Sequence, residues 1–194
     1  MSRKPSDRKK KTDSPPQKRI ALIGFRGVGK STIARHLEGL WQIKRVSLDS
    51  YITEHEGQSI EELVQEKGWN HFREKETYYL QEVSSFEAPL LVDMGGGIVE
   101  GPAGRKSQEK IDILKASFLC IYCYIDDDKL LARLDRLKKN KNRPALSSPG
   151  QESLSDVLQR RKPWYNEVAH AVVDVSDVSA REAAERITQL VRGR

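Results

Sequence analysis

Apolar runs and amphipathic stretches alternate along this chain of 194 residues. Five apolar runs predict β-strands, and the last three are nearly continuous, as expected for strands that are covered on both faces. These runs span residues 19–24, 44–48, 89–94, 118–125 and 171–175. Between them, apolar positions recur at helical spacing over residues 30–41, 59–67, 69–86, 127–139, 153–168 and 179–191. The alternation predicts an α/β fold in which helices flank a parallel five-stranded sheet.

Two stretches interrupt the alternation. Residues 49–86 are mostly helical and contain no strand pattern, so they predict a helical insertion between the second and third strands. Residues 138–153 are polar and contain Pro144, Pro149 and Gly150, which predicts a mobile loop. A long loop within a compact domain is usually functional or disordered, and we interpret this one as a lid.

The net charge of +6 is concentrated at the N-terminus. Residues 1–19 carry eight Lys or Arg and two Asp, whereas the rest of the chain has 26 basic and 26 acidic residues and is neutral. This distribution argues against nucleic acid as a partner of the folded body, because binding would need a basic face. We expect residues 1–18 to be a disordered tail, with any nucleic-acid contact confined to it, and residues 19–194 to form one domain.

The sequence also predicts a cytoplasmic location and no membrane partner. No apolar run approaches the length of a membrane span, and the N-terminus lacks the apolar core of a secretion signal. Cys120 and Cys123 lie three residues apart in one strand run, so their side chains should face opposite sides of the sheet without forming a disulfide. Two reduced core cysteines fit a reducing compartment.

The segment GFRGVGKS, residues 24–31, matches the phosphate-binding pattern G-x-x-x-x-G-K-[ST] and lies between a strand run and a helical run. Its glycines allow backbone N–H groups to turn towards a phosphate, and the helix N-terminus adds positive potential. Lys30 is expected to reach the β- and γ-phosphates, and the Ser31 hydroxyl to hold Mg²⁺. The alternative is an ordinary glycine turn. We predict a nucleoside triphosphate site made by Gly27, Val28, Gly29, Lys30, Ser31 and Thr32.

The surroundings of this motif indicate what receives the phosphate. A GTPase would carry N-K-x-D after a strand, but here Asn140 and Lys141 lie in the polar loop instead. A short chain with a helical insertion and an arginine-bearing loop is typical of a small-molecule kinase. Such an enzyme must exclude water with a closing lid, or it hydrolyses ATP.

Six motifs, in order along residues 19–194, make the chain resemble the shikimate kinases. They are GFRGVGKST, LDSYITEHEGQSIEEL, HFREKE, MGGGIV, RPAL and RRKPWYNEVA. The resemblance implies transfer of the ATP γ-phosphate to the 3-hydroxyl of shikimate, with Mg²⁺ as cofactor, on the route to chorismate and the aromatic amino acids. It also implies a fold like that of the nucleoside-monophosphate kinases, and we expect a monomer whose partners are ATP and shikimate.

The resemblance assigns a carboxylate clamp to two arginines. Arg73 and Arg161 match the family positions that hold the shikimate carboxylate, for which a planar guanidinium fork is well suited. Glu76, three residues after Arg73 on the same helix face, could orient that arginine. Without the other motifs, Arg73 would be interpreted as part of a surface ion pair.

The acceptor hydroxyl has its own candidate residues. Asp49, at the end of the second strand run, matches the aspartate that binds the hydroxyl and could take its proton. Gly95, Gly96 and Gly97 follow the third strand run and would let the substrate lie against backbone N–H groups. The alternative is a plain glycine turn.

Two arginines in or near the predicted lid are candidates for nucleotide contacts. Arg143 matches the lid arginine that reaches the ATP phosphates, so Lys30, Asp49 and Arg143 form the predicted catalytic set. Arg136, seven residues earlier, also matches a nucleotide-facing arginine in some family members. A solvated helix face is an equally good interpretation of Arg136.

The metal site departs from the family pattern. The family usually has D-x-D at the end of the second strand, but this chain has Ser47 where the first aspartate would lie. Asp93 ends the third strand run, where an aspartate serves the metal in P-loop enzymes generally. We therefore expect Asp93, together with Ser31, to serve Mg²⁺. The alternative is that Asp93 caps the following glycine turn.

Two further segments differ from the expected pattern. Residues 176–180 lack an arginine that some members place near adenine, and residues 101–110 are longer and more polar than expected, with no assigned role. Two other functions stay open: a related small-metabolite kinase, such as a gluconate kinase, and a binding module that has kept the fold without catalysis. The paired arginines and triple glycine disfavour the first, and the retained site residues disfavour the second.

Overall fold

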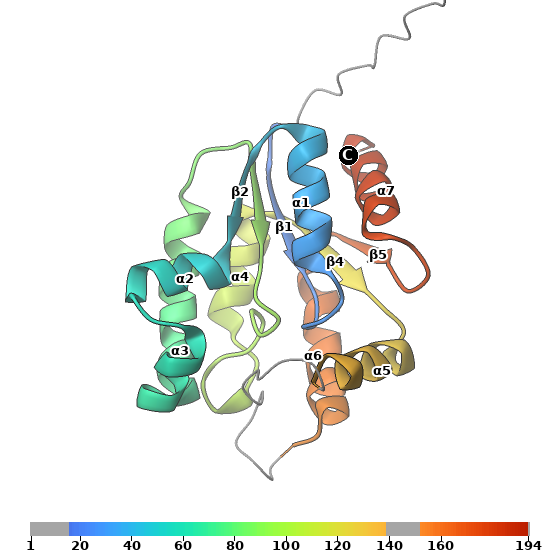
Figure 1. Ribbon diagram of the computed structural model, residues 1–194. Helices are drawn as coiled ribbons and strands as arrows, with labels where there is room; N and C mark the ends of the chain where they lie inside the picture. Colours follow the sequence, from blue (N-terminus) through green and yellow to red (C-terminus); the bar gives the residue numbers. More distant parts are fainter. Residues whose placement is uncertain (1–15, 139–151, 194) are drawn as a thin grey trace, which may run out of the picture.

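A five-stranded parallel β-sheet forms the centre of the computed structural model, which describes residues 16–138 and 152–193 (Figure 1). The strands lie in the order β2-β3-β1-β4-β5. Their bounds are Arg19–Ile23 for β1, Lys44–Ser47 for β2, Leu90–Asp93 for β3, Leu119–Tyr124 for β4 and Ala171–Asp174 for β5. All four strand pairings are parallel, so the predicted sheet is confirmed.

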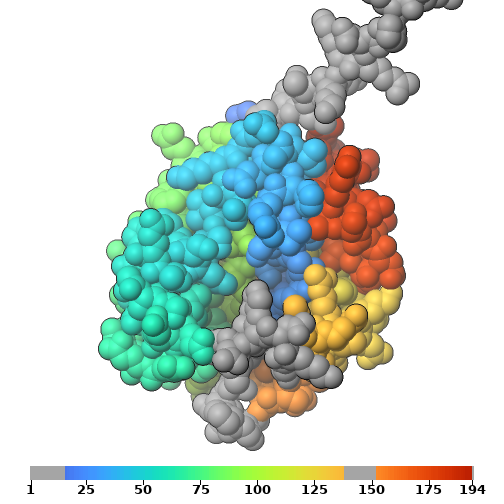
Figure 2. Space-filling model, in the orientation of Figure 1, coloured from blue at the N-terminus to red at the C-terminus, as the bar shows by residue number. Residues whose placement is uncertain are grey.

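Helices cover both faces of the sheet. Their bounds are Lys30–Trp41 for α1, Leu48–Glu56 for α2, Ile60–Ser84 for α3, Gln108–Ser117 for α4, Asp127–Lys138 for α5, Leu154–Val168 for α6 and Ala180–Arg192 for α7. Helices α1 and α7 pack together on one face, while α4 and α6 contact β4 from behind it in the view of Figure 1. Helices α2 and α3 pack on each other, on the side of the molecule away from α7 (Figure 2).

The helical insertion agrees with its sequence pattern. Residues 49–86 are mostly helical, and the break predicted between residues 59–67 and 69–86 is present as a kink inside α3. Gly68 has a φ of 82° inside it and kinks the helix, because glycine adopts this left-handed conformation without a steric penalty. Ser59 begins α3 with a capping box to Glu62.

Helix α4 was not predicted from the sequence. It begins within the polar segment 101–110, and its buried face contains a lysine, Lys110, beside Ile111 and Leu114. A buried lysine shortens the apolar pattern on which helix prediction depends. The start of α4 is nevertheless marked by Ser107, whose hydroxyl accepts from the Lys110 backbone N–H.

The prediction that β5 is covered on both faces is wrong. Its residues alternate between buried and exposed, and Val172 is 51% exposed. The reason is its place at the edge of the sheet, where α7 covers it on one face. Strands β3 and β4 behave as predicted, since nearly all of their side chains are buried, and the same is true of β1 between them.

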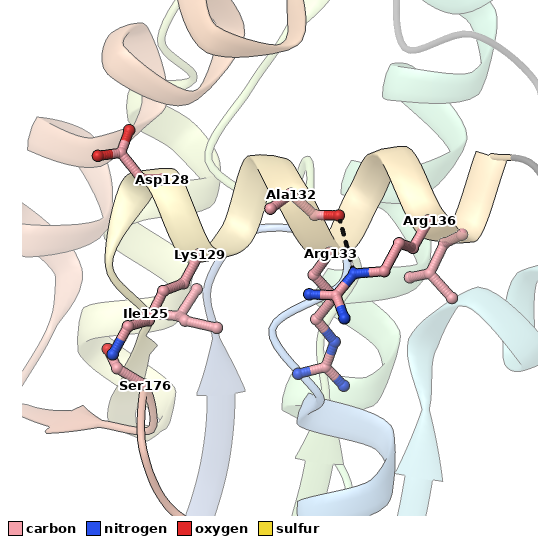
Figure 3. A pocket seen from close by; sticks show the side chains of 8 residues that line it. Ile125, Asp128, Lys129, Ala132, Arg133, Arg136 and Ser176 are labelled. Carbon is pink, nitrogen blue, oxygen red and sulfur yellow. Dashed lines mark hydrogen bonds between the residues drawn. The ribbon is translucent and has the colours of Figure 1, made fainter.

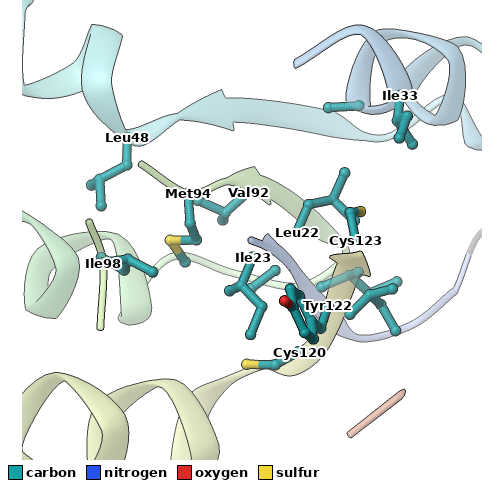
Figure 4. Close-up of a cluster of buried hydrophobic side chains, with 14 of the residues drawn as sticks. Leu22, Ile23, Ile33, Leu48, Val92, Met94, Ile98, Cys120, Tyr122 and Cys123 are labelled. Carbon is teal, nitrogen blue, oxygen red and sulfur yellow. The ribbon is translucent and has the colours of Figure 1, made fainter. Parts of the chain in front are cut away.

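Side chains from the inner strands fill the two layers of core on either side of the sheet (Figure 4). Leu22 and Cys123 belong to the layer that faces Ile33 of α1, whereas Ile23 and Val92 belong to the other layer. Cys120 and Cys123 are both buried and free, and they point to opposite sides of β4, as predicted. Burial raises the pKa of each thiol to about 12, so both are structural core residues without reactive thiolates.

Because every strand is parallel, the carboxyl ends of all five meet at one edge of the sheet. The loop after β1, the start of α2 after β2 and the turn after β3 therefore come together there. This edge is where open parallel sheets bind ligands. In the part of the chain that the structure describes, no helix combines the length and apolarity needed to cross a bilayer.

We expect Thr188→Val to reduce the free energy of unfolding by about 1–3 kcal/mol, because it leaves a buried donor unpaired. The Thr188 hydroxyl accepts from Trp41 Nε1 at 3.0 Å and thereby joins α7 to α1. Equilibrium denaturation measures the change. Thr53→Val is the control, since the Thr53 hydroxyl only donates to a carbonyl one turn back in α2. Equal losses in both variants would contradict the role assigned to the Trp41 contact.

Candidate active site

The P-loop between β1 and α1 leaves the first turn of α1 open to an anion. Gly29, which precedes the helix, has a φ of 103° and no side chain that could cap it. Lys30 is buried, and its Nζ donates to the carbonyl oxygens of Gly24 at 2.8 Å and Phe25 at 3.1 Å. Burial lowers the pKa of Lys30, although the charge of Asp93 opposes this. An uncapped helix N-terminus beside a lysine has the chemistry of a phosphate site.

Asp49 lies in the first turn of α2 rather than at the end of the strand, because β2 ends at Ser47. The residue is exposed as a whole, but its carboxylate reaches the turn after β3. A Cβ at Gly95 would lie 2.5 Å from Asp49 Oδ1 and 3.2 Å from Glu76 Oε1. Burial of this carboxylate, helped by the charge of Glu76, raises the pKa of Asp49 to about 6. Such a group can accept a proton near neutral pH.

Asp93 ends β3 and is almost completely buried. In the sheet it pairs with Leu22 of β1 on one side and with Ser47 of β2 on the other. Positions 47 and 93 are therefore neighbours, and β3 adjoins the P-loop strand as expected. Among the described residues no hydrogen bond to the Asp93 carboxylate is present, so the alternative role as a turn cap is not observed.

A cavity of about 650 Å³ runs along α5 beside the P-loop (Figure 3). Arg133 points its guanidinium at the P-loop, and its Nη2 is 3.8 Å from where a Cβ on Gly29 would lie. Arg136 also lines the cavity, while its Nε donates to the Ala132 carbonyl at 3.3 Å. Arg143 lies outside the described residues. The walls are formed by Ile125, Asp128, Lys129, Ala132, Arg133, Arg136, Leu137 and Ser176.

Arg73 projects from α3 into the core of the site, where both of its terminal nitrogens are engaged. Nη1 donates to Glu76 Oε2 at 2.9 Å, which is the orienting contact predicted from the spacing. Nη2 donates to Glu100 Oε2 at 2.8 Å. A Cβ at Gly97 would collide with this guanidinium, so the glycine is needed for the arginine to lie against the turn.

Arg161 projects from α6 and is fully buried. Its Nη1 donates to the Gly96 carbonyl at 3.2 Å, and its Nη2 donates to Glu100 Oε2. Glu100 thus brings Arg73 and Arg161 together. The Arg161 Nε is buried and has no hydrogen-bond partner among the described residues. Burying an unpaired guanidinium N–H is costly, so this atom is suited to an acceptor supplied by a ligand.

The glycine turn, residues 95–97, mainly makes room for neighbouring side chains and accepts hydrogen bonds from them. The predicted role was to present backbone N–H groups to a substrate. In the structure, Gly95 and Gly97 make room for Asp49 and Arg73, and the Gly96 carbonyl accepts from Arg161 and the Tyr165 hydroxyl. The three glycines therefore fix the positions of the groups that would contact a substrate.

A buried network of ion pairs surrounds the two arginines. Lys110 is fully buried, and its Nζ donates to Glu76 Oε2 at 2.5 Å and to the Glu100 carbonyl at 2.8 Å. Arg160 Nη1 donates to Glu100 Oε1 at 2.5 Å, and its Nε and Nη2 donate to the two carboxylate oxygens of Glu152. Its buried members are three cationic side chains and two carboxylates, Arg73, Lys110 and Arg161 with Glu76 and Glu100, while the half-buried Arg160 and Glu152 form a neutral pair at its edge. The buried part of the network therefore carries one surplus positive charge.

Sequence reasoning missed several members of the site. Glu100 precedes the polar segment 101–110 to which no role was assigned, Lys110 ends it, and Arg160 precedes the predicted Arg161. The signal available was weak: charged residues near a glycine motif and next to an arginine. Arg133 could have been found from its spacing, since it lies three residues before Arg136 on the same helix.

The fold and the site together define a P-loop kinase that acts on a small molecule. The phosphate-binding loop opens beside a buried cationic network and a carboxylate with a raised pKa, at the ligand-binding edge of a parallel sheet.

Comparison with known proteins identifies the family to which the chain belongs. The family model described as shikimate kinase matches residues 26–192. A shikimate kinase of Acinetobacter baumannii (strain AYE) is 33% identical over 173 residues, which are 89% of this chain and 91% of the relative. One from Halorhodospira halophila is 34% identical over 176 residues, 90% and 94% of the two chains. A solved structure of the Acinetobacter baumannii enzyme in complex with shikimate has a TM-score of 0.79 and 31% identity, and the match covers 93% of this chain and 95% of that one. The chain belongs to the shikimate kinase family.

We expect Lys110→Met to lower the free energy of unfolding by about 3 kcal/mol, because it removes a buried partner from Glu76. Lys106→Met is the matched control. Lys106 pairs with Glu167 at 3.1 Å on the surface, where an ion pair contributes about 0–1 kcal/mol. Chemical denaturation of both variants gives the comparison, and a Lys110 effect no larger than the Lys106 effect would contradict the account of the buried network.

Proposed function

We propose that this chain binds ATP and shikimate and transfers the γ-phosphate to the 3-hydroxyl of shikimate. The observation that carries the proposal is the surplus positive charge of the buried network, together with the unpaired Nε of Arg161. One carboxylate would neutralise the surplus and satisfy this donor. Shikimate has one carboxylate, and its hydroxyls would extend from there towards Asp49.

The P-loop residues would hold the nucleotide. The Lys30 ammonium donates to two carbonyl oxygens at the start of the loop. If phosphate oxygens replaced these acceptors, its charge would lie where negative charge develops during phosphoryl transfer. The cavity along α5 is the proposed place for the nucleoside, with Arg133 and Arg136 on its wall. The phosphate-contacting role of Arg143 stays a prediction.

Asp49 is the proposed general base. Its carboxylate lies against Gly95, and the carbonyl of the next residue, Gly96, accepts from Arg161 of the clamp. A hydroxyl bound at this turn would therefore be within reach of Asp49. Desolvation of the carboxylate and the charge of Glu76 raise the pKa of Asp49, which makes the ionised form a better proton acceptor than an aspartate of ordinary pKa.

Mg²⁺ is the proposed cofactor, held between the nucleotide and two residues of this chain. The Ser31 hydroxyl follows Lys30 in the first turn of α1, and the Asp93 carboxylate adjoins the P-loop strand without a hydrogen-bond donor among the described residues. Within residues 16–138 and 152–193, no three His, Cys, Asp or Glu side chains converge into a metal site. Phosphate oxygens and water usually supply most ligands of Mg²⁺ in kinases, so one hydroxyl and one carboxylate of the chain would complete the shell.

The proposed setting is the cytoplasm, since two buried free thiols suit a reducing compartment. We infer that the chain acts as a monomer and that the basic tail takes no part in catalysis. Deleting residues 1–18 should leave catalysis unchanged, because this stretch contains none of the motifs of the site.

The direct test is ATP turnover measured by a coupled assay, with shikimate, with gluconate and with no acceptor. We expect ADP to form rapidly only with shikimate, and Lys30→Ala to abolish it while the circular dichroism spectrum is retained. Turnover that shikimate does not stimulate would contradict the proposed function, and stimulation by gluconate would favour the alternative kinase.

The pKa of Asp49, raised to about 6 by burial and by Glu76, predicts the pH profile of kcat/KM for shikimate. Asp49 must be ionised to accept a proton, so the rate should fall as the pH drops through about 6 and level off above it. Asp49→Asn should remove most of the activity at every pH. An unchanged acidic limb in a partly active Asp49 variant would assign that limb to another group.

Asp93→Asn tests the metal role, because asparagine keeps an oxygen but loses the charge. We expect the Mg²⁺ concentration for half-maximal activity to rise several-fold, with thermal stability nearly unchanged. Ser47→Asp in the same background should restore the metal response, since the two positions are paired in the sheet. An unaltered Mg²⁺ dependence in Asp93→Asn excludes this role.

A further inference from the structure

Glu100 is a buried carboxylate that occupies the two arginines expected to hold the substrate. We propose that Glu100 is an internal competitor for the substrate carboxylate, which fills the Arg73–Arg161 clamp in the free enzyme and thereby sets its affinity for shikimate. The inference rests on the proposed function, because it takes an anionic substrate at this clamp.

The atoms that Glu100 occupies are the ones a substrate carboxylate would use. Its Oε2 accepts from Nη2 of both Arg73 and Arg161. A guanidinium offers a two-pronged fork either through Nη1 and Nη2 or through Nε and Nη2, so Nη2 belongs to both forks. Glu76 and the Gly96 carbonyl already accept from the two Nη1 atoms. With Glu100 in place, no fork on either arginine is wholly free of a protein acceptor.

Glu100 is charged in this position. Burial alone would raise its pKa, but the guanidinium groups of Arg161 and Arg73 outweigh burial and hold the pKa below its ordinary value. A second carboxylate brought to the clamp therefore meets a negative charge as well as occupied donors. Like charges held close together in a partly desolvated site repel strongly.

The network also contains a second cationic partner for Glu100, which remains when the clamp is occupied by a substrate. Its other oxygen, Oε1, accepts from Nη1 of Arg160 at 2.5 Å. Arg160 lies nearer the surface than the clamp and is held by the bidentate contact with Glu152. When a substrate carboxylate takes the Nη2 atoms, Glu100 keeps this partner and stays neutralised, so the exchange leaves no buried charge unpaired.

The first experiment compares shikimate binding to the wild type, Glu100→Gln and Glu152→Gln by calorimetry. Glutamine keeps the size and one acceptor oxygen of Glu100 but removes its charge. We expect Glu100→Gln to bind shikimate about tenfold more tightly, with ATP affinity unchanged. Glu152→Gln removes a carboxylate from the same network away from the clamp, and its shikimate affinity should stay close to that of the wild type.

Equal or weaker shikimate binding by Glu100→Gln overturns the proposal and leaves Glu100 as a residue that positions the arginines. A similar tightening in Glu152→Gln also overturns it, because the effect would then come from net charge rather than from the clamp.

A second experiment needs no substrate. Glu100→Ala empties the place between the arginines, and a small carboxylate should fill it. We expect sodium acetate to raise the Tm of Glu100→Ala more than sodium chloride of equal ionic strength does, and to show no such preference in the wild type or in Glu152→Ala. Equal effects of the two salts on Glu100→Ala overturn the proposal.

The two experiments separate this inference from the proposed function. Wild type that binds no shikimate contradicts the proposed function, and the acetate comparison then decides whether the clamp selects a carboxylate. If Glu100→Ala does not fold, calorimetry with Glu100→Gln decides the matter.

Discussion

Burying a guanidinium group is costly unless carboxylates and carbonyl oxygens surround it, and the site depends on meeting this requirement for Arg161. The fully buried Arg161 is held by Glu100 and the Gly96 carbonyl, which couples α6 to the turn after β3. Glu100 also accepts a hydrogen bond from Arg73 of α3, and Lys110 of α4 joins the same network by donating to Glu76. Three helices far apart in sequence are thus fixed around one cluster of charges. Because the cluster retains one surplus positive charge, it favours an anion.

The sheet places this cluster next to the phosphate chemistry. Parallel strands deliver the P-loop, the start of α2 and the glycine turn to one edge, where the turn contacts Asp49 through Gly95 and Arg73 through Gly97. The turn therefore links the group that would accept a proton to the group that would hold the substrate. Positioning of reactants by rigid elements accounts for much of the catalysis expected of a phosphoryl-transfer enzyme, since the protein does little covalent chemistry itself.

Most of the fold could be predicted from the sequence, because the apolar runs of β1, β3 and β4 and the amphipathic helices carry their own signals. The exceptions have physical causes. Helix α4 buries Lys110, which breaks its apolar pattern, and β5 lies at the sheet edge, which no local pattern reveals. The same holds for the site: local motifs and family resemblance identified Lys30 and Arg73, whereas the role of Glu100 depends on contacts with residues up to 61 positions away. A charge in a polar segment gives no sign that it will be buried between arginines.

In the proposed function, the buried network leaves one positive charge for the carboxylate of shikimate. The most direct measurement is the calorimetric affinity of the wild-type chain for shikimate and for its methyl ester, which has the same ring and hydroxyls but no charge. Loss of a charge-assisted contact to a buried guanidinium corresponds to about 1.5–3 kcal/mol, so we predict that the ester binds at least tenfold more weakly. Equal affinities for the acid and the ester would contradict the account.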